Sequence, residues 1–164
     1  MELLPGGMTL EIFDLDGLPM YNPDVEDQGL PEPVHLLRRA IEAVDGLLIA
    51  TPEYNYSVSG ALKNAIDWAS RPPDSPLDGK PLAIMGAGGR HGTVRAQLHL
   101  REIALHNSMR VLISPDVEVP QPSEKFDSSL RLMDANTRKR LRDLLAAFAG
   151  WIEHSKADPT LRLI

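Results

Sequence analysis

Two apolar runs constrain the fold most, "GLLIA" (46–50) and "KPLAIMGA" (80–87), because almost every position in them is apolar. A strand with this pattern is covered on both faces, as in a parallel sheet. Segments with apolar residues at helical spacing separate these runs from each other and from a third run, "RVLIS" (110–114). Strands that alternate with helices of about 10–15 residues are typical of βαβ units. The sequence therefore predicts an α/β fold with a doubly wound parallel sheet.

The same periodicity gives approximate bounds for each element. A strand is also predicted where apolar and polar residues alternate in "MTLEIFDL" (8–15). The predicted strands are 8–15, 46–50, 80–87 and 110–114, and the predicted helices are 31–46, 57–70, 93–107 and 135–155. The proline-rich polar segments 70–81 and 114–127 are predicted to be surface loops. The length of 164 residues indicates one domain, which we expect to span 1–155, with a loose tail at 156–164.

Composition excludes several classes of function. The chain has no cysteine, which rules out disulfides, thiolate catalysis and thiolate metal sites. Its net charge of −6 argues against nucleic acid or an anionic membrane as the main partner. No apolar run approaches the roughly 18 residues of a membrane span, and the acidic start "MELLPGGM" is unlike a signal peptide. We therefore expect a soluble cytoplasmic protein whose partner is a small molecule, with no metal site.

Ligands of an open parallel sheet bind at the carboxyl ends of its strands. Three segments lie there in the predicted fold. They are "DLDGLPMYNPD" (14–24), "TPEYNYS" (51–57) and "GAGGRHGT" (86–93).

The segment "TPEYNYS" places aromatic and amide side chains where a few small polar residues would suffice. Pro52 restrains the residue before it to an extended shape and ends the strand. Tyr54 and Tyr56 offer flat apolar faces with polar tips, which suit a planar heteroaromatic ligand. Three side chains are able to cap the helix that follows: Asn55, Ser57 and Ser59. A capped turn with two surface tyrosines is the alternative interpretation.

The sequence around this segment also shows a family resemblance. The run "TPEYNYSVSGALKNAIDWASRP", followed by "PLDGKPLAIMGAGGRHGTVRAQ", resembles the NADPH-dependent FMN reductase family. These are flavodoxin-like enzymes that include quinone, chromate and azo-dye reductases. The resemblance extends over residues 2–125, because "EIFDLDGLPMYNPDVE" also looks like the family's second strand and the loop after it.

The resemblance implies which residues bind the cofactor. By position, five residues of the first loop would line the flavin, with main-chain N–H groups meeting its pyrimidine atoms: Pro52, Glu53, Tyr54, Asn55 and Ser57. In the second loop the family's flavin contacts fall on Gly86, Gly88, Gly89 and Arg90, although Arg90 and His91 are also consistent with solvated loop residues. A G-x-G-x-x-G dinucleotide fingerprint would need glycine where His91 stands.

The resemblance also implies a missing segment. The family begins with a strand, a phosphate-binding loop of the form G-S-x-R-x-x-S-x-N, and a helix. This sequence begins at "MELLPGGM", which looks like the end of that helix. We therefore expect the N-terminal βα unit to be missing, which puts the FMN affinity of this form in question.

The function implied by the resemblance is hydride transfer from NADPH to FMN and then to a quinone-like acceptor, in a homodimer or homotetramer. The flavin carries the chemistry, so no catalytic side chain is expected. A non-catalytic scaffold that no longer binds FMN is one alternative. Another is a magnesium-dependent phosphatase of the haloacid-dehalogenase type, because "FDLDGLPM" places Asp14 and Asp16 after a predicted strand. That chemistry needs a second acidic pair, for which Asp116 and Glu118 are a poor substitute.

Overall fold

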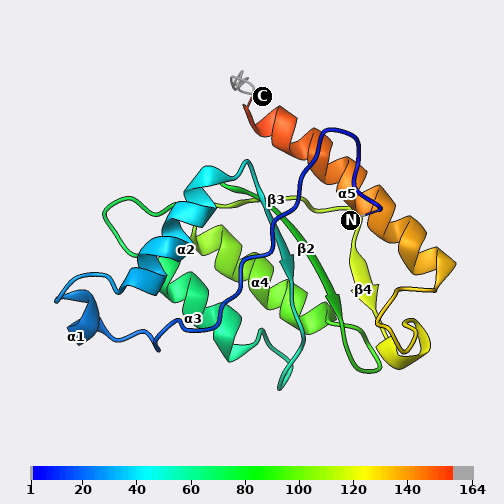
Figure 1. Cartoon of the computed structure of the whole chain (residues 1–164), viewed down its shortest axis with the longest axis horizontal. Helices are drawn as coiled ribbons and strands as arrows, with labels where there is room; N and C mark the ends of the chain where they lie inside the picture. Colours follow the sequence, from blue (N-terminus) through cyan, green and yellow to red (C-terminus); the bar gives the residue numbers. More distant parts are fainter. Residues whose placement is uncertain (1, 157–164) are drawn as a thin grey trace, which may run out of the picture.

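A four-stranded parallel sheet lies at the centre of the protein, whose computed structural model describes residues 2–156 (Figure 1). Its middle strand is β2 (Pro81–Ala87), and β1 (Leu47–Ala50) pairs along one edge of it. Along the other edge, β3 (Arg110–Val111) pairs with the start of β2 and β4 (Val117–Val119) with its end. Neighbours on both edges and helices on both faces explain why the run at 80–87 is almost wholly apolar.

Helices cover both faces of the sheet. Leu82 and Ile84 of β2 pack with residues of α2, α3 and α4 on one face. Ala83, which points the other way, packs with Leu144 and Phe148 of α5. Figure 1 shows α5 set apart from the other three long helices. The helices are α1 (Pro23–Glu26), α2 (Glu32–Ala43), α3 (Gly60–Ala69), α4 (Val94–His106), η1 (Pro122–Glu124) and α5 (Ala135–Lys156).

Most predicted elements are confirmed to within a few residues. The helix predicted over 57–70 begins later, at Gly60, because Ser59 takes the N-cap position and its hydroxyl accepts the N–H of Leu62 at 3.3 Å. The strand predicted over 110–114 is shorter than expected and pairs only at its first two residues. The predicted tail lies outside the described residues except for Lys156, which ends α5.

The strand predicted over 8–15 is wrong. Residues 9–14 make no backbone–backbone hydrogen bond within the described range 2–156, and Ile12 is 87% exposed. An extended segment becomes a strand only where a neighbour supplies a ladder of N–H and C=O groups, and none of the described strands does so here. The expectation that an N-terminal βα unit is missing stays a prediction.

The prediction of a surface loop over 114–127 is also wrong in part, since this segment contains β4. Val117 and Val119 are buried at 2% and 6% exposure, whereas Glu118 between them is not. The alternation of apolar and polar residues in V-E-V indicates a strand. It is only three residues long and lies between prolines, so the sequence pattern favoured a loop.

The loops that follow β1 and β2 approach each other at Gly86. A Cβ there would lie 2.0 Å from the Thr93 hydroxyl oxygen and 2.3 Å from the Thr51 carbonyl oxygen. The Thr51 N–H in turn donates to the Met85 carbonyl at 3.0 Å. Position 86 therefore has room for glycine only, and this contact sets the distance between the two loops.

We predict that Gly86→Ala lowers the free energy of unfolding by about 1–3 kcal/mol, because main-chain atoms cannot move aside as a flexible side chain can. The matched control is Gly60→Ala at the start of α3, where an added Cβ meets nothing within 4 Å. The control should be neutral or stabilising by about 0.5–1 kcal/mol. Urea denaturation measures both, and equal stability of the two variants would contradict the packing role of Gly86.

Candidate functional site at the carboxyl edge of the sheet

Residues 54–57 form a tight two-residue turn. The Tyr54 N–H donates to the Ser57 carbonyl at 3.0 Å, and the Ser57 N–H donates to the Tyr54 carbonyl at 2.9 Å. Between them, Asn55 and Tyr56 have φ values of 49° and 63°, the pattern of a type I′ turn. Asparagine tolerates this left-handed backbone, but for tyrosine it costs about 1–2 kcal/mol. The surroundings must therefore hold the turn in place.

The first turns of α4 supply that hold. The Arg95 guanidinium lies over the Tyr56 ring, 4.0 Å from its centroid, a cation–π contact. One turn further along the helix, the His99 Nδ1 and the Ser57 hydroxyl lie 3.0 Å apart, at hydrogen-bond distance. Both contacts join the exposed side of α4 to the tip of the turn.

Glu53 makes a third connection to the same helix. Its Oε2 accepts the main-chain N–H groups of Arg95 at 2.9 Å and Ala96 at 3.1 Å. The Glu53 side chain is only 12% exposed, and its Oε1 lies 3.7 Å from the Arg95 guanidinium. Thr93, at the N-cap position, makes no side-chain cap of its own. The carboxylate of Glu53 thus caps α4 from outside the helix.

The glycine loop after β2 lies beside Glu53. It is fixed to the end of β4 and the residues after it, because the Gly88 N–H donates to the Val119 carbonyl at 3.1 Å and the Gln121 N–H donates to the Gly89 carbonyl at 2.7 Å. A Cβ on Gly88 would lie 4.0 Å from the Glu53 main-chain nitrogen, so the two loops meet here.

The glycines of this loop have different surroundings. Gly92 has φ +64° and a virtual Cβ 2.8 Å from the Cβ of Glu118, so packing alone requires glycine. Gly89, with φ +38°, has nothing within 4 Å of its virtual Cβ. The main chain at Gly89 is therefore open to a second molecule, next to the exposed residues Arg90 and His91.

The structure brings the predicted site residues together at one edge. Tyr54 and Tyr56 are exposed by 62% and 65%, and the open glycine loop lies next to their turn. The residues gathered there are Pro52, Glu53, Tyr54, Asn55, Ser57, Gly86, Gly88, Gly89 and Arg90. The sequence did not predict the roles of Arg95 and His99. Both lie at solvent-facing positions of a predicted helix, and this pattern gives no sign that they hold the turn.

The "LKNAIDW" part of the motif holds a different loop. The Asn64 side chain accepts the Tyr21 N–H at 2.7 Å and donates to the Pro19 carbonyl at 3.0 Å. The indole N–H of Trp68, which is fully buried, donates to the same Pro19 carbonyl at 2.8 Å. These residues of α3 therefore position the segment after 8–15.

The acidic residues of the phosphatase alternative are engaged in contacts with other protein groups. Asp14 Oδ1 accepts the Asp16 N–H at 3.0 Å, as in a solvated turn. Asp116 and Glu118 pair with arginines, at 2.7 Å from Arg101 and 2.9 Å from Arg140. Within residues 2–156, no three side chains of the metal-binding types converge.

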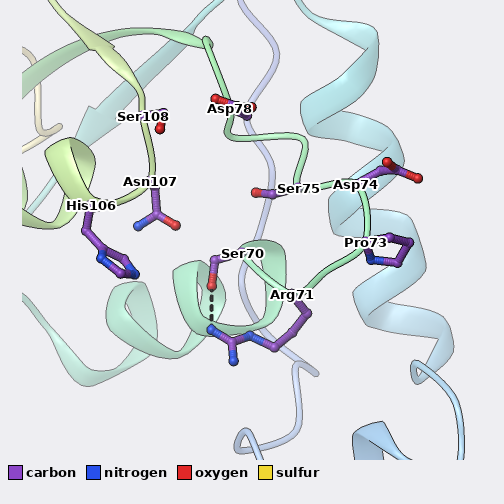
Figure 2. A pocket seen from close by; sticks show the side chains of 9 residues that line it. All are labelled: Ser70, Arg71, Pro73, Asp74, Ser75, Asp78, His106, Asn107 and Ser108. Atoms are coloured by element: carbon purple, nitrogen blue, oxygen red, sulfur yellow. Dashed lines mark hydrogen bonds between the residues drawn. The ribbon is translucent and has the colours of Figure 1, made fainter.

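A cavity of about 410 Å³ lies at the opposite, amino edge of the sheet, between the ends of α3 and α4 (Figure 2). Its polar wall includes Arg71, Asp78 and His106. The nearby helix end is already satisfied, because Arg71 donates to the Asp67 carbonyl at 2.8 Å. The buried Arg38 donates to the carbonyls of Ala69, Arg71 and Asp74 at 2.7–2.9 Å. These contacts hold the end of α3 and the chain after it, and they do not indicate a ligand.

Comparison with known proteins shows which family the chain belongs to. Residues 1–123 match the NADPH-dependent FMN reductase family. The chain belongs to this family. It is 48% identical to an NAD(P)H-dependent FMN reductase of Pseudomonas aeruginosa, over 92% of this chain and 82% of that protein. It is 41% identical to a quinone reductase of Escherichia coli, over 94% of this chain and 85% of that protein.

A solved structure agrees. FerB, a flavoenzyme NAD(P)H:(acceptor) oxidoreductase from Paracoccus denitrificans, matches with a TM-score of 0.84 and 35% identity, over 94% of this chain and 85% of that chain. The predicted flavodoxin-like fold is confirmed. The chain is a flavin-dependent NAD(P)H oxidoreductase with FMN as its cofactor, as the sequence predicts. No helix within residues 2–156 is long and apolar enough to cross a membrane.

We predict that Arg95 offsets the backbone strain at Tyr56. In an Arg95→Met background, Tyr56→Gly should raise the free energy of unfolding by about 1 kcal/mol, because glycine adopts the left-handed backbone freely. With Arg95 present, the gain should be smaller by about 0.5–1 kcal/mol, since the cation–π contact is lost. Urea denaturation of the four proteins measures the coupling. Equal effects of Tyr56→Gly in both backgrounds would show that Arg95 does not stabilise the turn.

Proposed function

We propose that the 54–57 turn and the glycine loop at 86–92 hold the isoalloxazine ring of FMN over the carboxyl edge, with NADPH as hydride donor and a quinone-like acceptor. One observation carries this proposal: the two loops meet beside an open main chain at Gly89 and an exposed Tyr54. When bound, FMN supplies the redox chemistry, which is to take a hydride from NADPH and pass electrons to the acceptor.

The main chain of the turn fits the polar edge of such a ring. Within residues 2–156, the N–H groups of Glu53, Asn55 and Tyr56 have no hydrogen-bond partner. Unpaired N–H groups at a fixed turn suit carbonyl oxygens and ring nitrogens, and they also favour negative charge on the ligand. The turn is held from three sides, so these donors keep their places without reorganising.

The side chains supply shape and exclude water. Tyr54 offers a flat apolar surface next to the loop, and Pro52 fixes the chain entering the turn. The open backbone at Gly89 gives the ligand close approach from the other side, and Arg90 lies next to it with a positive charge. None of these groups has to gain or lose a proton. We therefore assign positioning, and no acid–base role, to the predicted site residues.

The acceptor, assembly and location form the finer part of the proposal. Relatives named quinone reductase and NADPH:quinone oxidoreductase support a quinone-like acceptor. A homodimer or homotetramer is supported by apolar side chains left exposed on α4, Leu98 at 54% and Leu105 at 79%. Location in the cytoplasm is consistent with the lack of cysteine, because this chain needs no oxidising compartment to form disulfides.

The purified chain tests this function directly. FMN is added in steps and its fluorescence followed, and then consumption of NADPH is measured with and without a benzoquinone. We expect fluorescence quenching on binding and quinone-dependent loss of NADPH absorbance. A protein that neither quenches FMN nor oxidises NADPH would contradict the proposal, and magnesium-dependent hydrolysis of a generic phosphate ester would favour the phosphatase alternative.

We predict that Gly89→Ala weakens FMN binding about tenfold, because its Cβ stands between the open main chain and the ring. The matched control is Gly79→Ala, which has φ +67° and equally open surroundings but lies in the connection before β2, at the amino edge. Both variants should lose similar stability, about 1 kcal/mol, since both place a side chain on left-handed backbone. Fluorescence titration and urea denaturation separate the effects. Equal FMN affinity of the two variants would remove Gly89 from the site.

A further inference from the structure

We propose that Glu53 is a positioning residue that acts through α4: its carboxylate, bonded to the N-terminus of the helix, holds the 54–57 turn against the glycine loop. This inference rests on the proposed function, because the turn matters only if it holds the ring. It also goes beyond the family resemblance, which places Glu53 along the flavin and gives its carboxylate no role of its own.

The first step is that α4 has no cap of its own. Thr93 occupies the N-cap position, but its hydroxyl is turned toward Gly86 and lies 3.0 Å from the Gln97 side-chain nitrogen. The N–H groups at the second and third positions of the helix, those of Arg95 and Ala96, would lack partners without Glu53. A carboxylate at this position satisfies both groups and also meets the positive end of the helix dipole.

The second step is that Glu53 is committed to the helix. Its Oε2 accepts two N–H groups, its Oε1 lies near the Arg95 guanidinium, and the side chain is 12% exposed. A carboxylate in these contacts is not free to touch a ligand. Its main-chain N–H, by contrast, has no partner within residues 2–156 and lies beside Gly88. The carboxylate of Glu53 therefore binds the helix, whereas its main-chain N–H stays open to a ligand.

The third step is that one helix end positions both loops. Arg95 contacts Glu53 with its N–H and guanidinium and also covers the Tyr56 ring. Thr93, next to it, fills the space at Gly86. Release of Glu53 frees the start of the turn and removes the anchor that orients Arg95. The strained backbone at Tyr56 then loses its support.

The experiment compares Glu53→Ala and Glu53→Gln with a cap elsewhere in the molecule. Asp134 is the matched control: at the start of α5 its Oδ1 accepts the Thr137 hydroxyl and, at 2.9 Å, the Thr137 N–H, and these two bonds hold the pKa of Asp134 below its usual value. Asp134→Ala removes a helix cap of the same kind, but on an element that does not touch the turn. Each variant is studied as the full chain, with FMN titration, thermal unfolding and amide hydrogen exchange without FMN.

We expect Glu53→Ala to raise the FMN dissociation constant about tenfold, equal to about 1.4 kcal/mol, and Glu53→Gln by less, since its amide oxygen still accepts the two N–H groups. In the flavin-free protein, exchange of the Ser57 amide should speed up in Glu53→Ala. Asp134→Ala should lower the melting temperature by a few degrees without changing FMN affinity or Ser57 exchange.

Two results would separate failure of this inference from failure of the proposed function. If the wild-type chain binds FMN and Glu53→Ala binds it equally well, with unchanged Ser57 exchange, Glu53 is only a helix cap and the inference is wrong. If the wild-type chain does not bind FMN, the proposed function fails. The Ser57 exchange rate in the flavin-free variants still decides whether Glu53 holds the turn.

Discussion

The carboxyl edge of this protein depends on the contact at Gly86. Because no side chain stands there, the Thr51 carbonyl and the Thr93 hydroxyl both reach the end of β2. That approach brings the chain leaving β1 close to the start of α4, within hydrogen-bond distance of Glu53. A larger residue at position 86 would push the two loops apart and so weaken the contacts between the turn and the helix.

The fold was predictable where burial imposes a period. The strands at 46–50 and 80–87 are apolar throughout because helices cover both faces, and α2, α3 and α4 show the spacing of a helix with one buried side. The alternation at 8–15 led to a wrong strand prediction. Periodicity describes only the side chains, whereas a strand also needs a neighbouring strand for its main-chain hydrogen bonds. β4 was missed for the opposite reason. It is hydrogen-bonded to β2, but three residues are too few for an alternating pattern to be recognised.

The site was predictable in location and less so in detail. The motif places Tyr54 and Asn55 at the carboxyl edge, as the structure does. The sequence gives no sign that Glu53 reaches a helix that begins about 40 residues later, because side-chain contacts between distant segments leave no periodic trace. Nor does it separate Gly86, which is required for packing, from Gly89, which is open. Only coordinates show which neighbour each glycine has.

The chain after α3 is held by a guanidinium, that of Arg38, whereas the 54–57 turn is held in part by the carboxylate of Glu53. Arg38 is buried and donates to three main-chain carbonyls, and no described carboxylate lies within ion-pair distance of it. A guanidinium stays charged at any pH a protein survives, and a carbonyl has no proton to gain. Acidification that would break a carboxylate ion pair therefore leaves these three bonds intact, so the chain after α3 keeps this attachment in acid.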